Sequence, residues 1–415
     1  MARTAHLPFT TALLVGLPVF WAYPEGLSAW RSVAIVTGWV CCGLLLACLL
    51  FIIREPWLAK HLGGLERMYT WHHWIGFAAY VVILGHPLAL ALDAWDEHPS
   101  LAWSVLSPWE QSWPGWLGWV SLLCLMVGMW ITLASCIRYS TWRWLHIFLA
   151  VAVILAVGHL ILLGLDYMLL WTPLLAMCFM AWRVIRSDCG TAAKPFVVTR
   201  VSKPAQDIVE VVLKPLLHPI VAKPGQFLLA SFGDGPHFHG CREFHPFTIS
   251  ALSPSGELSL GIKALGDCTN HLQSVECGVA TRLQGPFGSF LANQSTRPGL
   301  WVAGGIGITP FLAVLRAGPL KYPVQLLYLY RTEEDAAYLD ELHAFAQHDT
   351  NFKFTAKNSG PYAPELSDIL PTAAELRELD CYLCGPPGLV TATVSFLRKQ
   401  GVPAERMFFE RFDFR

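Results

Sequence analysis

Four histidines stand in two apolar stretches of this chain, where an imidazole without a partner is costly. Residues 71–90 read WHHWIGFAAYVVILGHPLAL, and in this stretch His72 and His86 are fourteen residues apart. On an α-helix this spacing puts both side chains within about 40° of one face and about 20 Å apart along the axis. His146 and His159 are thirteen residues apart in a second stretch. We therefore expect these four imidazoles to bind a common kind of ligand.

Paired imidazoles from facing helices are the axial ligands of six-coordinate haem iron, and helical bundles commonly house such sites. If both helices start on one side of a membrane, His72 would face His146 and His86 would face His159, which predicts two stacked haems. His73 points about 100° away from His72 and is expected to be a bystander. His159 lies about 140° around from His146 on an ideal helix, so the second helix needs a local distortion. The alternative for each histidine is a simple hydrogen bond to a backbone carbonyl.

The elements that carry these histidines are predicted to cross a bilayer. The 415 residues are 54% hydrophobic and 14% charged, with a mean hydropathy of +0.44, well above the values of soluble proteins. The apolar runs are near the length of a spanning helix, and there are six of them: 7–24, 32–53, 69–92, 115–137, 144–163 and 167–185. A formal charge of −1 gives no basic face for nucleic acid.

The loop charges predict the orientation, because basic residues collect on the cytoplasmic side. The loops on the side of the N-terminus carry Arg3, Arg54, Lys60, Arg67, Arg138, Arg143, Arg183 and Arg186, and those on the other side carry Arg31, Asp93, Asp96, Glu97 and Glu110. We therefore expect residues 1–186 to form a six-helix transmembrane haem domain, with the N-terminus and the rest of the chain in the cytoplasm.

The sequence patterns of the second half of the chain predict two smaller domains. From about residue 195, the alternating runs PFVVTRV, DIVEVVL and GELSLGIK are typical of an antiparallel β-barrel, placed at 195–292. After residue 297, WVAGGIGITPFLAVL, PVQLLYLY and DCYLCGPPGLVTATVSFLRKQ read as strands that are followed by helices. This alternation predicts an α/β domain with a parallel sheet at 297–415.

Three stretches of this half suit flavin and nicotinamide chemistry. In REFHPFTIS, residues 242–250, a rigid proline, an aromatic ring and hydroxyl groups could lie along an isoalloxazine ring. The glycines of GGIGITP, residues 304–310, come between a strand and a helix, where backbone amides can approach a pyrophosphate. CGPPG, residues 384–388, ends another apolar strand, at the edge where parallel sheets bind ligands.

The twelve cysteines show no spacing typical of a zinc or iron–sulfur site, so we expect small buried side chains in a reducing compartment. Cys381 and Cys384 form the one CxxC, which could be a redox pair. We prefer Cys384 as a thiol that faces the nicotinamide and Cys381 as a core residue, because dithiol sites usually stand at a helix start.

Taken together, six apolar helices with paired histidines, HPFTIS, GDCTNHL, GPFGSF, GGIGITPF, CGPPG and a C-terminal aromatic tail resemble the NADPH oxidase and ferric reductase superfamily. The likeness is greatest to its bacterial NADPH oxidase members. The resemblance implies a multi-domain chain: a ferric-reductase-like six-helix transmembrane bundle, then a ferredoxin-reductase-like module of a FAD-binding barrel and an NAD(P)H-binding α/β domain. It also implies a bacterial inner membrane location.

The resemblance assigns residues by position. It implies that two b-type haems are bound by His72, His86, His146 and His159. It implies that FAD is bound by His245, Pro246, Phe247, Thr248, Ser250 and Thr269. The nicotinamide dinucleotide would be bound by Gly304, Gly305, Gly307, Thr309, Pro310, Arg331, Cys384, Gly385, Pro386 and Pro387. Phe414 would cover the flavin, with Phe412 as the alternative. NADPH is preferred over NADH, with Arg331 as support.

The implied activity is electron transfer from NADPH through FAD and the haems to molecular oxygen outside, which gives superoxide. One departure concerns the acceptor: the family often has a further histidine one turn beyond the outer ligand, and here Leu90 occupies that position. Arg31, the one cation predicted outside, is then the candidate to stabilise superoxide. The alternatives are a ferric-chelate reductase, with Asp93, Asp96, Glu97 and His98 as a cation-attracting mouth, and a haem-binding channel without catalysis.

Overall fold

The computed structural model describes residues 6–21, 23, 25–134, 137, 139–165, 169–291, 297–360 and 366–410. The chain separates into two compact units, Met1–Cys189 and Gly190–Arg415, which we call the helical unit and the reductase unit. The reductase unit contains both a barrel and a parallel sheet in one compact body.

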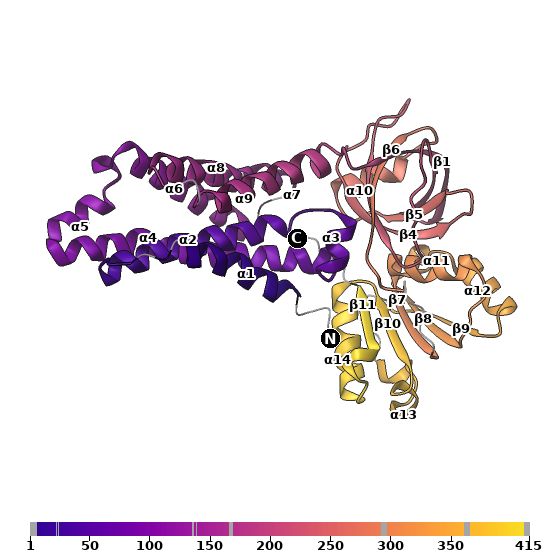
Figure 1. Ribbon diagram of the computed structural model, residues 1–415. Coiled ribbons are helices and arrows are strands. Elements are labelled where there is room, and N and C mark those ends of the chain that lie inside the picture. The colour runs from indigo at the N-terminus through magenta and orange to yellow at the C-terminus, as the bar shows by residue number, and fades with distance from the viewer. Residues whose placement is uncertain are drawn as a thin grey trace. The chain divides into compact units, whose positions relative to one another are not determined.

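The helical unit consists of long apolar helices that lie side by side (Figure 1). The long helices are α1 (His6–Trp21), α2 (Ala29–Leu50), α4 (Leu65–Glu97), α6 (Trp113–Leu133), α8 (Ile147–Leu162) and α9 (Trp171–Trp182), and the short ones are α3 (Pro56–His61), α5 (Pro99–Leu106) and α7 (Tyr139–Leu145). Helix α4 packs against α2, and α8 packs against α6. These two helix pairs carry His72, His86 and His159, and His146 immediately precedes α8.

The expected six spans are all helical, but their lengths differ from the prediction. Among the described residues, four helices are long and apolar enough to cross a membrane, namely α2, α4, α6 and the run Thr141–Leu162. The first helix has only 16 residues, and α9 has 12 before it continues as a π-helical turn, Arg183–Asp188. The expected helical bundle is therefore confirmed, with four of its helices long and apolar enough to span within the described residues. A proline and a glycine follow the first helix closely, and the end of the last is charged.

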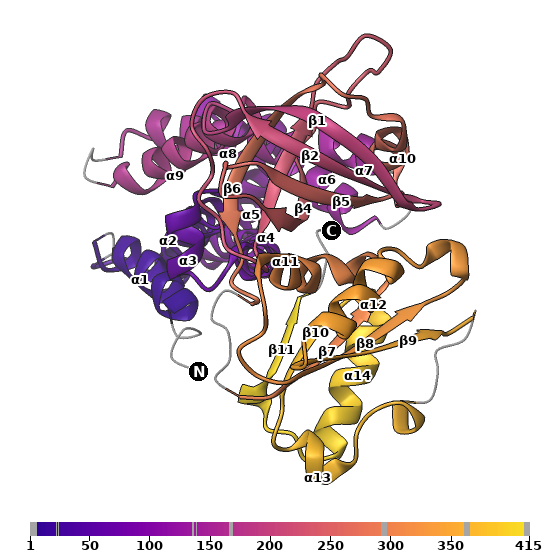
Figure 2. The same ribbon diagram turned by 90° about the vertical axis from the view of Figure 1, so that its right-hand side faces the viewer.

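The first half of the reductase unit is the expected antiparallel barrel (Figure 2). It closes in the order β1-β2-β5-β4-β3-β6, with β1 (Lys194–Ala205), β2 (Ile208–Pro215), β3 (Phe227–Phe232), β4 (His245–Leu252), β5 (Leu258–Lys263) and β6 (Ala280–Phe287). The short helix α10 (Asp267–His271) follows β5. Alternate side chains such as Val209, Val211 and Leu213 fill the barrel core.

The second half is the expected parallel sheet with helices on both faces. Its order is β11-β10-β7-β8-β9, with β7 (Gly299–Gly304), β8 (Val324–Tyr330), β9 (Phe352–Asn358), β10 (Asp380–Cys384) and β11 (Met407–Glu410). Helices α11 (Thr309–Ala317) and α12 (Leu339–His348) bury one face. Helices α13 (Ala373–Leu376) and α14 (Pro387–Lys399) bury the other.

A partly buried ion-pair cluster joins the barrel to the sheet. Arg316 of α11 donates to Glu210 of β2 at 2.7 Å and to Glu341 of α12 at 2.7 Å. Burial opposes its charge, but the hydrogen bonds to these two carboxylates raise the pKa of Arg316 above its usual value. The guanidinium also bonds the carbonyl of Ser250, so α11 is held against β4. The predicted flavin strand therefore lies directly against the nucleotide-binding half.

Candidate functional site

The two histidines of α4 are both held by backbone carbonyls of α2. His72 Nδ1 lies 2.9 Å from the carbonyl oxygen of Cys48, and His86 Nδ1 lies 2.7 Å from that of Ala34. A carbonyl oxygen can only accept a hydrogen bond, so each Nδ1 carries the proton and donates it. The two rings are therefore oriented by the same neighbouring helix.

The other two histidines are held in the same way by α6. His159 Nδ1 lies 2.6 Å from the carbonyl oxygen of Pro114. His146 Nδ1 lies 3.2 Å from Thr132 Oγ1, and that hydroxyl already donates its proton to the carbonyl of Gly128 at 2.8 Å. The hydroxyl must then accept from His146, so Nδ1 is again the donor.

All four rings consequently donate from Nδ1, which leaves Nε2 to face a ligand. This is the arrangement of metal-ligating histidines, which donate the other ring N–H to a carbonyl or hydroxyl that fixes tautomer and orientation. A histidine that only needed one hydrogen bond could use either nitrogen. The donor set therefore fits haem iron better than it fits four unrelated buried histidines.

The histidines approach one another in the expected pairs. His146 lies within electrostatic range of His72, and His159 lies within range of His86. The main helix contacts are α2 with α4 and α6 with α8, and α4 makes little direct contact with α8.

Glycines of the neighbouring helices make room for the two outer rings. A Cβ at Gly118 of α6 would lie 3.0 Å from His159 Cε1, and one at Gly38 of α2 would lie 3.4 Å from His86 Nδ1. The sequence does not reveal this match, because each glycine is far from its histidine along the chain.

The fifth span has the irregularity that the spacing of its histidines requires. Helix α7 ends at Leu145 and α8 begins at Ile147, so the break falls on His146 itself. His73 is exposed, and its ring meets that of Trp74 edge to face, with centroids 5.4 Å apart. The side chain of His73 therefore does not share the environment of His72.

Arg31 lies within electrostatic range of His86, at the end of the unit where it was expected. Its guanidinium is 3.9 Å from a carboxylate oxygen of Asp93, and the Arg31 side chain is 52% exposed. Ser28 also donates to Asp93. The positive charge near the outer pair is therefore partly balanced by an acidic partner that the sequence alone did not assign.

The flavin stretch forms β4, and its side chains divide between the two faces of the strand. Thr248 is 4% exposed, and its hydroxyl has no hydrogen-bond partner among the described residues. Such an orphaned buried hydroxyl is costly unless a ligand satisfies it. Phe247 points the other way, into the barrel core, with its ring centroid 6.3 Å from that of Phe232. His245 and Pro246 begin the strand and are partly exposed.

Two of the residues predicted to bind FAD also make hydrogen bonds within the protein. Ser250 donates its hydroxyl to Glu210 at 2.5 Å, within the cluster around Arg316. Thr269 Oγ1 accepts from the backbone N–H groups of Leu265 and Gly266, each at 2.9 Å, and so caps α10.

The two glycine turns of the nucleotide domain pack on each other at the carboxyl edge of the sheet. Gly304 ends β7, and a Cβ there would lie 2.9 Å from Pro386 Cδ. A Cβ at Gly307 would lie 2.3 Å from the carbonyl oxygen of Cys384. Gly385 has a φ of +156°, and its Cβ would lie 3.0 Å from the nitrogen of Gly304. The backbones can approach this closely only because these positions have no side chain.

The remaining nucleotide residues surround these turns. Gly305 has a φ of +53° at the start of the turn. Thr309 donates to the carbonyl of Ile306 at 2.9 Å, and Pro310 follows it, buried, in the first turn of α11. Arg331 is exposed just after β8, at the same edge of the sheet. Pro387 begins α14. Phe414 and Phe412 lie outside the described residues.

Cys381 and Cys384 lie on opposite faces of β10, as the alternation of a strand requires. Burial, with a smaller contribution from Asp380, raises the pKa of the Cys381 thiol to about 12, so this thiol stays protonated and unreactive. Neither cysteine forms a disulfide. The two residues are therefore not a redox pair, and Cys384 is the one at the edge with the glycine turns.

Sequence reasoning missed two features of this region. Glu410, at the end of β11 opposite Cys384, is only 5% exposed, and its Oε1 lies 3.2 Å from where a Cβ on Gly288 would be. The one feature of the sequence that could have indicated Glu410 is that an acidic residue stands within the aromatic C-terminal stretch. Cys241 and Cys268 are joined by a disulfide, although cysteines were expected to be isolated core residues. That expectation is wrong for this pair, because the barrel brings together loops that are 27 residues apart in sequence.

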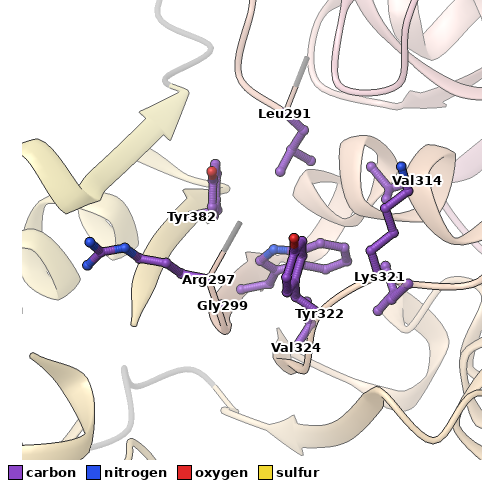
Figure 3. Close-up of a pocket in the computed structure, with 10 residues that line it drawn as sticks. Leu291, Arg297, Gly299, Val314, Lys321, Tyr322, Val324 and Tyr382 are labelled. Carbon is purple, nitrogen blue, oxygen red and sulfur yellow. The ribbon is translucent and has the colours of Figure 1, made fainter. Parts of the chain in front are cut away.

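A small cavity lies elsewhere in the nucleotide domain (Figure 3). It is lined by Leu291, Arg297, Gly299, Trp301, Val314, Leu320, Lys321, Tyr322, Val324 and Tyr382. Gly299 and Val324 are the first residues of β7 and β8. The cavity therefore lies at the amino edge of the sheet, away from the glycine turns.

Two family models match the chain. Residues 37–157 match "Ferric reductase like transmembrane component", and residues 301–395 match "Oxidoreductase NAD-binding domain". The first match contains His72, His86 and His146 and ends two residues before His159, and the second contains both glycine turns.

Curated relatives resemble the reductase part of the chain. The toluate 1,2-dioxygenase electron transfer component of Pseudomonas putida is 32% identical over 187 residues, which are 42% of this chain and 55% of that protein. The propane 2-monooxygenase reductase component of Rhodococcus jostii (strain RHA1) is 29% identical over 238 residues, 52% of this chain and 62% of that protein. The chain thus spans little more than half the length of these relatives.

Among solved structures, a flavohemoglobin from Malassezia yamatoensis with bound FAD and heme is similar in fold. The TM-score is 0.50 at 17% identity, over 94% of this chain and all of that one. The matched regions, the apolar helices and the barrel with its parallel sheet show that this is an integral membrane protein with the architecture of the NADPH oxidase and ferric reductase type.

Proposed function

We propose that this chain is an NADPH oxidase: it transfers electrons across a membrane from NADPH to molecular oxygen, giving superoxide, with FAD and two b-type haems as cofactors. The proposal places the N-terminus and the reductase unit in the cytoplasm of a bacterium and the acceptor on the outer side of its inner membrane. The observation that carries it is the uniform anchoring of His72, His86, His146 and His159 through Nδ1.

The proposed residues divide the work between the two units. When bound, FAD would accept a hydride from NADPH, and the haems would carry single electrons. Thr248 would bond the flavin through its orphaned hydroxyl, and His245 and Thr269 would lie along the rest of the cofactor. The glycine turns that begin at Gly304 and Cys384 would hold the dinucleotide, with Arg331 near its ribose and Phe414 over the flavin.

At the outer side, the acceptor would be reduced without binding iron, since His86 and His159 would both be ligands of that iron. Oxygen would then need a nearby cation to stabilise the developing anion, and Leu90 cannot provide one. Arg31 is the proposed group, because it lies within electrostatic range of His86.

A ferric-chelate reductase is the second candidate, and the acidic group near Arg31 favours it. Asp93 is 3.9 Å from Arg31, and Asp96 and Glu97 are exposed at the end of α4. Such a cluster lowers the net positive potential that superoxide would need and attracts cationic metal complexes.

The deciding experiment compares acceptors with the purified full chain loaded with haem and FAD. NADPH-driven cytochrome c reduction should be abolished by superoxide dismutase if oxygen is the acceptor. Reduction that the dismutase does not affect, together with faster turnover on ferric chelates, would transfer the protein to the reductase class. Low-spin bis-histidine spectra with two haems per chain are expected in either case, and their absence would refute both.

A further inference from the structure

A cysteine pair fastens the loop between β3 and β4 to α10. Cys241, in this loop, is bonded to Cys268, in α10, with the Cα atoms 5.8 Å apart. A ring nitrogen of His245 and the two sulfurs all lie within 4.8 Å of one another. The segment enclosed by the bond contains β4 and β5, and with them the stretch from His245 to Ser250. The bond therefore joins the two segments that are proposed to hold FAD.

The loop is docked on the barrel by other contacts as well. Glu276 Oε1 accepts from the backbone N–H groups of His237 at 2.7 Å and Phe238 at 3.1 Å. The ring of Phe238 stacks on that of His271, with centroids 5.0 Å apart. These contacts do not depend on the cysteines, nor does the bond from the Arg242 N–H to the Phe232 carbonyl at 3.2 Å, so breaking the disulfide should chiefly loosen the attachment of this loop to α10.

The surroundings of the pair suit reversible oxidation. Cys241, His245 and Cys268 are partly exposed, whereas Cys381 and Cys384 are buried. Small oxidants and reductants can therefore reach the pair, and an imidazole this close can accept the proton of one thiol. Cys277 is also exposed in the barrel, but it is a free cysteine.

We propose that Cys241 and Cys268 form a reversible thiol–disulfide site that sets how firmly FAD is held. In a reducing compartment the pair starts as two thiols. One thiolate attacks a peroxide, an S–O bond forms, the O–O bond breaks, and one water leaves. The second thiol displaces the hydroxyl from this sulfenic acid, which forms the S–S bond and releases a second water. The two cysteines lose two electrons and the peroxide gains them; a dithiol reverses the step.

The direction of the expected effect on FAD release follows from how far the FAD-binding segments are ordered before the cofactor binds. FAD is proposed to touch both the His245 strand and the Thr269 turn, and the disulfide fixes these segments relative to each other before the cofactor binds. A site that is already ordered loses less conformational entropy on binding. The oxidised chain should therefore release FAD about fivefold more slowly than the reduced chain. The inference rests on the proposed function only for the identity of the cofactor.

The test uses the full chain in detergent, with FAD loaded. Mass spectrometry after peroxide treatment should find the Cys241–Cys268 cross-linked peptide, and a dithiol should remove it. FAD release is monitored, after dilution of the loaded chain, as the recovery of flavin fluorescence. It should be faster from the chain in which the disulfide has been reduced. Cys241→Ser and Cys268→Ser should release FAD at the reduced rate under both conditions, while Cys277→Ser should respond like the parent chain.

The proposal would be overturned by the absence of a cross-linked peptide after peroxide, or by equal FAD release from both forms. Stoichiometric zinc bound by the reduced chain and lost in Cys241→Ser would also overturn it, in favour of a metal site. The proposed function is tested separately, by haem spectra and dismutase-sensitive reduction at saturating FAD. A redox-dependent release rate in a chain that makes no superoxide would support the cysteine site and refute the oxidase.

Discussion

The two units of this protein position their functional groups by different means. In the reductase unit, each candidate site is a short continuous stretch, such as the turn that begins at Gly304, and the strand before it delivers it to the edge of the sheet. In the helical unit, each candidate ligand is a single histidine, and the group that orients it comes from a different helix. Local sequence therefore describes the first kind of site well and the second kind poorly.

This difference leads to an expectation about mutations. Sites that depend on backbone turns should tolerate changes in neighbouring elements, whereas the histidines should depend on residues far away along the chain. Removing a ligand should have the largest effect, removing a hydroxyl an intermediate one, and altering the surroundings the smallest.

The largest effect is expected when an outer histidine is removed. His86→Ala should lose the outer haem, keep the inner one, and reduce transmembrane electron flow more than tenfold, because an axial ligand of the proposed path is gone. Haem content by pyridine haemochrome and anaerobic reduction by NADPH measure both effects. His73→Ala is the matched control, since its exposed ring should leave both haems in place; loss of a haem there, with none lost in His72→Ala, would show that the register is wrong.

A smaller loss is expected in the reductase unit when the hydroxyl of Thr248 is removed. Thr248→Val keeps the shape of the side chain but removes the group that would bond the flavin, so FAD affinity should fall about tenfold. Titration of the apoprotein with FAD measures this change. Thr281→Val is the control, because Thr281 is also buried with an orphaned hydroxyl but lies in β6. Equal losses in the two variants would mean that Thr248 has no special role.

Much of the fold could be predicted from the sequence, because it follows from local patterns. Alternation predicted the barrel strands, and strand–turn–helix repeats predicted the parallel sheet. Length was less reliable: six apolar runs were expected to span, and α1 and α9 are shorter. Hydropathy identifies an apolar run, but the ends of a helix also depend on nearby prolines, glycines and charges.

The candidate site was predicted only in part, for a physical reason. The four histidines stood out because an apolar stretch makes them costly, but their partners on α2 and α6 carry no comparable signal. A backbone carbonyl such as that of Pro114 is invisible in a sequence, and so is the match of Gly118 to His159. The joining of Cys241 and Cys268 was hidden for the same reason, since only the closed barrel makes them neighbours.

A smaller effect again is expected when a glycine that is not proposed to contact a cofactor is substituted. In Gly118→Ala, the new Cβ would lie 3.0 Å from His159 Cε1, so the ring must shift. An overpacked contact of this kind costs about 1–3 kcal/mol, and the occupancy of the outer haem should fall severalfold while the inner haem persists. Gly16→Ala is the control, because nothing lies within 4 Å of its added Cβ. Equal haem content in the two variants would mean that α6 does not position His159.

The smallest effect is expected from the charges beside the outer pair. Arg31→Ala should slow oxygen reduction, and Asp93→Asn should speed it, because the neutral side chain no longer balances the guanidinium 3.9 Å away. Exposed pairs of this kind contribute about 0–1 kcal/mol, so each change should stay within about fivefold.

The two variants are compared by dismutase-sensitive cytochrome c reduction, with anaerobic haem reduction by NADPH as the control that should not change. The charges lie near a surface, so high salt should shrink the difference between the variants. If Arg31→Ala reduces oxygen as fast as the parent chain, the guanidinium does not stabilise superoxide. If Asp93→Asn slows ferric-chelate reduction instead, the acidic group attracts a metal complex, and the outer end of the helical unit is built for iron rather than oxygen.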